Sequence, residues 1–274
     1  QASILVSLYN SKKFEEAVQK GKMLIKKFPR QLMFYNATAL SLSSLGNIPE
    51  ALRILKEGLN VRPNDIFILN NLGLVNSNIN NNKISREYLE KALSINENFM
   101  DALLNLGNLN LKEGKTEHAK NNFIKALKLS KSTSSDETIN MALGNLNQQI
   151  GEFSQAIENY KIVNKINPQN TSADKAASTI YKYKNSEDLH YISMKNKIDL
   201  IKDQEDLKSL YFALGKACED FGNFDESLKY LKLGNLIADQ KIQYNVEEDK
   251  KLFAEIKRIL KIQILIILIL VRKK

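Results

Sequence analysis

The chain has few of the residues that most often build chemical centres. Its 274 residues include one cysteine, Cys218, and two histidines, His118 and His190. A single cysteine excludes a disulfide within the chain and a cysteine-based zinc site, and it fits a reducing compartment. Two histidines argue against a histidine-rich metal or acid–base centre. We therefore expect no metal site, no cofactor, no catalytic residue and a cytoplasmic location.

Arginine is also scarce, although the chain is basic. The formal net charge is +9, and most of the positive charge comes from lysine. The arginines are Arg30, Arg53, Arg62, Arg86, Arg258 and Arg272. Recognition of bases and phosphates favours clustered arginines interleaved with aromatic residues, and the sequence has no such cluster. We expect no nucleic-acid partner.

Long hydrophobic runs are missing as well. The apolar run Ile264 to Val271 has eight residues, whereas a membrane span needs about 18 or more. We expect residues 261–274 to be an apolar tail outside the fold, either a truncation or shifted reading frame or a short membrane contact, and prone to aggregation. The chain starts at Gln1 without a methionine or a signal peptide. This start suggests a fragment and leaves an upstream leader open.

What the sequence does have is a repeat of about 34 residues. Leucine-glycine pairs recur as Leu72-Gly73, Leu106-Gly107, Leu143-Gly144 and Leu214-Gly215. Small residues follow at a fixed offset, namely Ala51, Ser85, Ala119, Ala156 and Ser227. Pro29 and Pro63, which close units, also lie one period apart. This pattern is typical of the tetratricopeptide repeat, so it predicts an all-α fold, a helix-turn-helix solenoid wound as a right-handed superhelix.

Each unit can be divided into two helices. In the second unit, residues 32–65, apolar residues share one helical face, Gly46-Asn47 ends that helix, and Pro49 fits the first turn of the next. The following units begin at Ile66 and at Met100. Next comes a polar loop, Ser130–Asp136, which adds three residues to the period and whose serines and aspartate can cap a helix. The fifth unit follows this loop.

The repeat predicts a tight contact and a domain division. Glycine in mid-helix costs about 1 kcal/mol against alanine, so we expect Gly73, Gly107 and Gly144 to face the small residue of the partner helix. The pattern decays after Thr171. We therefore expect a repeat array over residues 1–184, a linking helix of different geometry over 185–207, and a further repeat with a capping helix over 208–260.

The first helix of each unit is expected to line the inner surface of the solenoid. The positions expected there are Met33, Asn36, Leu40, Phe67, Asn70, Asn71, Leu74, Asp101, Leu104, Asn105, Asn108, Met141, Asn145 and Gln148. Asparagine recurs among them, and its amide has donors and an acceptor that can pair with an extended peptide backbone. This resembles the asparagine ladder in the repeat domain of O-linked N-acetylglucosamine transferase, although here the ladder is partial.

The peptide-binding candidates are therefore Asn36, Asn70, Asn71, Leu74, Asn105, Asn108, Met141 and Asn145. Asparagine is frequent throughout the chain, so compositional bias stays open as the other explanation. A carboxylate clamp for acidic C-termini is not expected, because the inner positions of units two to four carry no converging lysines and arginines.

Residues 210–253 carry a more specific pattern than a generic repeat. The stretch 210–220 reads LYFALGKACED and 222–227 reads GNFDES, and Gly234-Asn235, Tyr244 and Phe253 follow. This resembles the last repeat of bacterial tetratricopeptide sulfotransferases, in which a repeat array precedes a sulfotransferase domain of the tyrosylprotein kind. The resemblance implies that the array recruits the acceptor of sulfate transfer.

The catalytic part of that family has no counterpart here. Its domain opens with an apolar strand and a Gly-x-Pro-Arg-Ser-Gly-Thr loop that holds the phosphosulfate donor, but no glycine occurs after Gly234 in this chain. Phosphate binding of this kind needs a glycine-containing loop. We expect the chain as given not to be an enzyme. Glu219 and Asp220, beside Lys216 on one helix, are expected to form a solvated face and not an acid–base pair.

Two functions follow from these patterns. The first is a scaffold that binds a protein or peptide partner, as the acceptor-recruiting front part of a sulfotransferase. The alternative is a structural repeat protein that mediates assembly of a larger complex and has no link to sulfate transfer.

Overall fold

The computed structural model describes residues 2–239, 250, 255 and 257, and these contain helices and turns but no strand. They fall into two compact units that divide between Tyr181 and Lys182. The apolar tail 261–274, the positions Tyr244 and Phe253 of the sulfotransferase pattern, and most of the expected capping helix lie outside the described residues. Within the described part, no helix is both long and apolar enough to cross a membrane.

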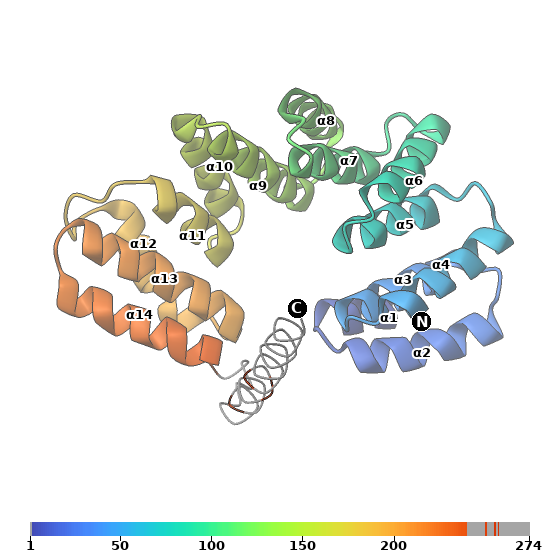
Figure 1. Ribbon diagram of the computed structural model, residues 1–274, viewed down its shortest axis with the longest axis horizontal. Coiled ribbons are helices and arrows are strands. Elements are labelled where there is room, and N and C mark those ends of the chain that lie inside the picture. Colours follow the sequence, from blue (N-terminus) through green and yellow to red (C-terminus); the bar gives the residue numbers. More distant parts are fainter. Residues whose placement is uncertain (1, 240–249, 251–254, 256, 258–274) are drawn as a thin grey trace, which may run out of the picture. The chain divides into compact units, whose positions relative to one another are not determined.

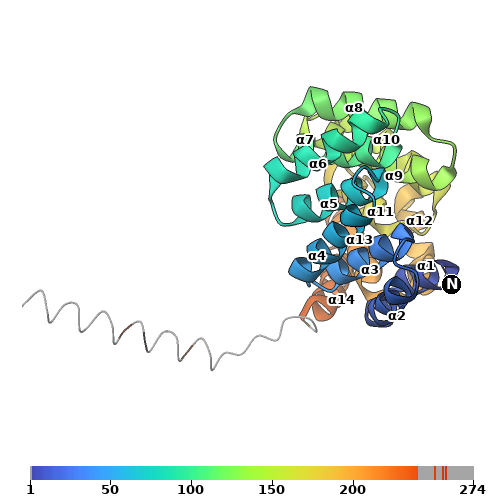
Figure 2. The ribbon, with the colours of Figure 1, turned by 90° about the vertical axis from the view of Figure 1, so that its right-hand side faces the viewer.

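The first unit consists of helices that pack in consecutive pairs (Figures 1 and 2). Its described helices are α1 Ala2–Asn10, α2 Phe14–Lys27, α3 Leu32–Ser44, α4 Ile48–Val61, α5 Ile66–Asn78, α6 Asn82–Ile95, α7 Met100–Lys112, α8 Thr116–Leu129, α9 Thr133–Gln149, α10 Phe153–Ile166 and α11 Thr171–Ile180. The pairs begin where the sequence repeat places them. The expected all-α array of helix-turn-helix units is therefore confirmed.

The second repeat shows why these residues fold into a helix pair. Leu32, Tyr35, Ala39 and Leu42 are buried on one side of α3. The chain then turns at Gly46, whose φ is +78°. The side chain of Asn47 accepts a hydrogen bond from the backbone amide of Glu50 and so caps α4, and a proline occupies the first turn of this helix.

The turn between paired helices needs the same backbone conformation in every unit. Positive φ occurs at the residues Lys12, Gly46, Asn80, Gly114, Gly151 and, in the second unit, Gly222. The first four follow one another at intervals of one repeat period. Glycine adopts this left-handed region without steric cost, and asparagine tolerates it better than most residues.

The helix-internal glycines lie mainly against large side chains of the partner helix. A Cβ atom built on Gly107 would lie 2.4 Å from the Phe123 ring, and one on Gly144 would lie 2.5 Å from the Tyr160 ring. One on Gly73 would lie 2.6 Å from the side chain of Leu89, and also 3.3 Å from the backbone oxygen of Ser85, the small residue expected there. The prediction was incomplete, because the space left by the missing side chain is filled mainly by the large residue four positions after the small one, a turn further along the partner helix.

The polar loop expected at 130–136 is mostly helical. Helix α9 begins at Thr133, and Ser132 caps it by accepting a hydrogen bond from the amide of Ser135 at 3.2 Å. The aspartate at 136 lies inside the first turn and not in the loop. The three additional residues of the period thus lengthen α9 at its start, and Gly144 keeps its place opposite α10.

The second unit contains α12 Leu189–Asn196, a short 3-10 helix Ile198–Leu200, α13 Gln204–Asp220 and α14 Phe224–Asp239. The stretch 185–207 thus holds α12, the 3-10 helix and the start of α13. Asp220 does not belong to a solvated face, because its side chain is 9% exposed. Its carboxylate accepts hydrogen bonds from Lys182 at 2.8 Å, from the Tyr183 amide at 3.1 Å and from Lys216. These contacts fasten the start of the unit to the end of α13.

Candidate functional site

The leading helices of the pairs form one surface in the first unit. Helices α1, α3, α5, α7, α9 and α11 each contact the next one in this series. We call their exposed side the inner face. Met33 on α3 and Phe67 on α5, both expected there, are 46% and 53% exposed. Large apolar side chains that remain this exposed are available to a partner.

Four asparagines of the inner face are joined by hydrogen bonds into what we call the asparagine row. The Asn105 amide donates to Oδ1 of Asn70 at 2.8 Å, the Asn70 amide donates to Asn71 at 3.4 Å, and the Asn71 amide donates to Asn36 at 2.8 Å. The row connects α7, α5 and α3. Each contact between helices joins side chains whose positions differ by one repeat period plus one, so it follows the repeat with an offset of one residue.

Because these asparagines bond to one another, they contribute to packing between helices and are only partly available to a partner. Asn70 is 5% exposed and Asn71 9%, while Asn36 and Asn105 are half-buried. Replacing them is expected to affect stability as well as binding, since their amides satisfy one another between helices. Asn36 and Asn105, at the ends of the row, keep the exposure that a partner needs.

The remaining predicted residues lie elsewhere on the inner face. Asn108 is exposed on α7, and Leu74 and Met141 are half-buried. Oδ1 of Asn145 accepts a hydrogen bond from the Tyr160 hydroxyl at 3.0 Å, and Gln148 accepts one at 2.7 Å. Burial raises the pKa of Tyr160 to about 12, so this hydroxyl stays a donor at neutral pH.

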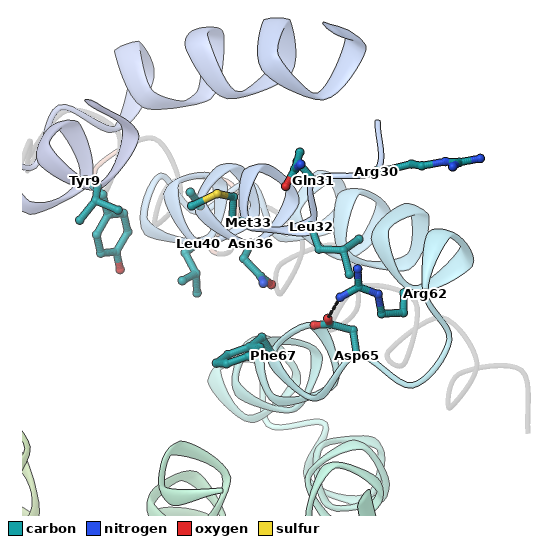
Figure 3. Close-up of a pocket in the computed structure, with 12 residues that line it drawn as sticks. Tyr9, Arg30, Gln31, Leu32, Met33, Asn36, Leu40, Arg62, Asp65 and Phe67 are labelled. Atoms are coloured by element: carbon teal, nitrogen blue, oxygen red, sulfur yellow. Dashed lines mark hydrogen bonds and ion pairs between the residues drawn. The ribbon is translucent and has the colours of Figure 1, made fainter. Parts of the chain in front are cut away.

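A hollow of about 510 Å³ opens on the inner face between α1, α3 and α5 (Figure 3). Its lining consists of Val6, Tyr9, Arg30, Gln31, Leu32, Met33, Asn36, Ala37, Leu40, Arg62, Asp65 and Phe67. Arg62 and Asp65 form an ion pair at 3.2 Å within this lining. The Asp65 side chain also caps α5 through the amide of Ile68 at 3.0 Å. We call this the apolar hollow.

The sequence did not identify several of these residues. Val6 and Tyr9 belong to α1, which precedes the first complete unit, and Arg62 and Asp65 lie in the turn before α5. A signal for Val6 was present, because it lies one repeat period before Leu40. The turn residues carry no such signal, since their place depends on the path of the chain between helices.

A second hollow of about 390 Å³ lies between α7, α9 and α11. Its lining consists of Asn108, Glu137, Thr138, Met141, Ala142, Asn145, Asn170 and Ser172. Oε1 of Glu137 accepts hydrogen bonds from the amides of Asn167 at 2.9 Å and Asn170 at 2.8 Å. We call this the polar hollow. Its lining includes three residues that the sequence predicted for the inner face, Asn108, Met141 and Asn145. The sequence analysis did not identify Glu137.

The inner face also carries a carboxyl group on α7, that of Asp101. Asp101, the second residue of α7, is exposed, but neighbouring protein atoms exclude part of the water around its carboxyl and raise its pKa. Among the described residues, no group of three or more histidine, cysteine, aspartate or glutamate side chains could hold a metal ion. The side chains described on the inner face include amides, carboxylates and apolar groups.

The pattern at 210–227 has a packing role in the second unit. A Cβ atom on Gly234 would lie 3.0 Å from the Phe212 ring, and one on Gly215 would lie 3.0 Å from Leu231. Asn223 caps α14 by accepting a hydrogen bond from the Glu226 amide at 3.2 Å. Glu226 in turn accepts a hydrogen bond from Tyr191 at 3.2 Å. Packing and capping thus explain residues of this pattern, which we had expected to be more specific than a generic repeat.

Comparisons with known proteins agree with this architecture. Residues 68–99 and 101–133 match the family model described as tetratricopeptide repeat. No curated protein sequence matches the chain significantly.

Solved structures that resemble the chain share little of its sequence. PilF of Pseudomonas aeruginosa is 18% identical with a TM-score of 0.58, over 74% of this chain and 90% of that one. A tetratricopeptide repeat protein from Parabacteroides merdae is 15% identical with a TM-score of 0.57, over 91% and 94%. A chain of the APC/C hetero-tetramer Cut9–Hcn1 is 14% identical with a TM-score of 0.61, over 85% and 42%.

Such identities show the fold alone. Together with the paired helices, they show that the described residues have the fold of a tetratricopeptide helix-turn-helix solenoid, in which residues 68–99 and 101–133 match the repeat itself.

Proposed function

We propose that the inner face of the first unit binds an extended segment of a partner protein. The observation that carries this proposal is the asparagine row, which lies beside the apolar hollow and shares Asn36 with it. An extended chain has backbone donors and acceptors that amides can satisfy, and side chains that an adjoining hollow can take up.

Exposed apolar side chains supply the affinity in this proposal. Met33 and Phe67 lie in the lining of the apolar hollow and are about half exposed. Covering each of them would contribute about 1 kcal/mol, because full burial of such a side chain is worth roughly 1.5–3 kcal/mol. The amides then position the partner, since an ordinary hydrogen bond adds only about 0.5–1.5 kcal/mol net.

The test is selection of a displayed library of short random peptides on the full chain, followed by titration of the selected peptides. Phe67→Ser on the inner face is expected to weaken them at least about tenfold, in line with the loss of a buried aromatic side chain. Phe153→Ser is the matched control, because Phe153 starts α10 and is 50% exposed. Selection without enrichment, or equal affinities for both variants, would contradict the proposal.

A finer version of the proposal is that the bound segment is the acceptor of a sulfotransferase to which this array belongs. Its support is the resemblance of residues 210–253 to the last repeat of tetratricopeptide sulfotransferases. The nucleotide sequence after codon 260, translated in all three frames, tests it. A Pro-Arg-Ser-Gly-Thr loop in any frame would favour this version, and its absence from all three would count against it.

The alternative role is assembly of a larger complex without capture of an extended segment. Light scattering on the purified chain, alone and with a selected peptide, separates the two roles. Peptide binding to a chain of unchanged mass favours the scaffold with a peptide groove. Self-association without peptide binding favours assembly.

A further inference from the structure

The inner face has different chemistry at its two hollows. Met33 and Phe67 are the second residues of α3 and α5, and the second residues of α7 and α11 are Asp101 and Ser172. A parallel series, which follows the lengthened period at its last step, runs through Leu40, Leu74, Asn108 and Asn145. Both series change from apolar to polar between α5 and α7. A partner that lies along this face therefore meets apolar side chains first and polar ones later.

The polar hollow contains a carboxylate that the protein holds in place. Both amides that fix Glu137, from Asn167 and Asn170, donate to the same oxygen, Oε1. Asn170 is itself fixed, because its Oδ1 accepts from the Ala173 amide at 2.9 Å and so caps α11. Among the described residues, no hydrogen bond reaches Oε2 of Glu137, and no lysine or arginine forms an ion pair with it.

The sign of the charge here is opposite to that of the chain as a whole. The chain has a net charge of +9, yet the lining of the polar hollow includes one carboxylate and no basic residue. In the apolar hollow, Arg62 pairs with Asp65, and the side chain of Arg30 extends away from the other lining residues (Figure 3). A cationic group is thus favoured at the polar hollow.

We propose that the partner is an extended peptide with an apolar anchor residue in the apolar hollow and a lysine or arginine at Glu137. This inference rests on the proposed peptide-binding function and specifies its ligand. Neighbouring packed helices lie roughly 9 Å apart, so the three steps from α3 to α9 cover about 27 Å. An extended chain advances about 3.3 Å per residue, which places the two side chains about eight residues apart.

Four synthetic peptides titrated by fluorescence anisotropy against the full chain test this inference. Two carry a Phe-Leu pair and a Lys-Arg pair, separated by the spacing estimated above, in the two opposite orders. The other two have Glu-Glu instead of Lys-Arg. One order of the cationic pair is expected to bind at least about tenfold more tightly than its acidic counterpart. Added salt is expected to reduce this difference, because it screens exposed charges.

Two protein variants test whether the preference for the cationic peptide depends on Glu137. Glu137→Gln keeps an acceptor for the two asparagine amides, and it is expected to weaken the cationic peptide about tenfold while sparing the acidic one. Glu158→Gln on α10 is the matched control, since it makes the same change of charge at a side chain that is 69% exposed. It is expected to leave both affinities unchanged.

The remaining outcomes show whether only the ligand assignment fails or the proposed peptide-binding function fails as well. Equal or tighter binding of the acidic peptides overturns the charge assignment, whatever the variants do, and leaves peptide binding intact. Failure of all four peptides, while library-selected peptides still depend on Phe67, overturns only this inference. Failure of both sets removes the proposed function as well.

Discussion

Glycine has two separate tasks in this chain, and the structure distinguishes them residue by residue. At Gly46, Gly114 and Gly151 the backbone has positive φ, and an added Cβ would meet no atom within 4 Å. At Gly107 and Gly144 the backbone is an ordinary helix, and the added Cβ would collide with an aromatic ring. The first group is required by backbone conformation and the second by packing.

The turn glycines should tolerate asparagine better than alanine, because asparagine adopts the left-handed region more readily. Gly46→Ala is expected to lower the free energy of unfolding by about 1 kcal/mol, the usual cost of the left-handed region for a residue with a Cβ. Gly46→Asn should cost less, because Asn80 adopts the same conformation at the equivalent turn of the next unit. Urea denaturation of both variants checks this order, and equal losses would contradict it.

The packing glycines should respond to their aromatic neighbours. Gly107→Ala is expected to destabilise the chain by about 1–3 kcal/mol, because overpacking forces side chains from their rotamers. Phe123→Leu in the same chain should recover part of this loss, since a leucine occupies the equivalent place opposite Gly73. A double-mutant cycle from denaturation midpoints measures the coupling. Additive effects would show that the ring is not what Gly107 accommodates.

Asp220 makes stability depend on pH. Burial by itself raises the pKa of this carboxyl, but the ammonium groups of Lys182 and Lys216 and the Tyr183 amide outweigh burial and hold the pKa below its ordinary value. The ionised form is therefore stabilised by folding. Its contribution is fully present above the unfolded pKa of about 3.9 and is lost as the pH falls through the lower folded value.

Asp220→Asn should therefore lower stability at pH 7, and the difference from the unaltered chain should shrink below about pH 4. The midpoint of urea denaturation, measured over a pH series, checks this. Glu219→Gln is the matched control, because Glu219 is the exposed neighbour on the same helix. A difference that persists at low pH would contradict the assigned role of the carboxylate.

At the residue scale, the sequence predicted faces better than contacts. The spacing of Leu32, Tyr35 and Leu42 identified the buried side of α3 correctly. The partner of Gly107 was mistaken, because a repeat shows which residues recur but not which of them meet across a helix pair. Asp220 was misjudged for the same reason, since Lys182 and Tyr183 lie outside the repeat.

At the scale of the helices, the asparagine row couples neighbouring units. Its bonds between helices join Asn105 with Asn70 and Asn71 with Asn36. The sequence placed these residues on the inner face, but it could not show that they bond to one another. That contact depends on how far adjacent helices are shifted along each other. The shift appears as the one-residue offset of the bonded positions from the repeat period.

Replacing Asn71 by alanine is expected to lower the free energy of unfolding by about 1–3 kcal/mol, because a buried amide loses its partner. Asn36→Ala should cost less in the Asn71→Ala chain than in the unaltered one, since the bond between them is already absent. Thermal denaturation of the single and double variants measures this coupling. The exposed Asn108→Ala is the control and should leave stability unchanged. Additive losses would show that the row contributes nothing as a unit.

At the scale of the whole molecule, the described residues form two compact units. The contacts of Gly107 lie within the first unit, and those of Asp220 lie within the second. Hydrogen exchange should therefore show that Gly107→Ala lowers amide protection within residues 2–181 and that Asp220→Asn lowers it within residues 182–239. Loss of protection across both units from either substitution would indicate one cooperative structure.

The two units also differ in how well the sequence repeat predicts their structure. The repeat period located successive helix pairs, because each pair packs mainly on its neighbours. It carried no information on α12, whose Tyr191 and Lys195 bond to Glu226 through contacts that occur only once in the described chain. Such single contacts leave no recurring pattern to find.

The asparagine row has a direction. All three of its hydrogen bonds are donated the same way, from Asn105 through Asn70 and Asn71 to Asn36. Turning one amide over would place two donors or two acceptors face to face, so the three bonds reverse together or not at all. The row therefore ends in a spare amide donor at Asn36 and a spare carbonyl acceptor at Asn105. A chain lying along it would find opposite polarity at the two ends, and with it a preferred orientation from amino to carboxyl terminus.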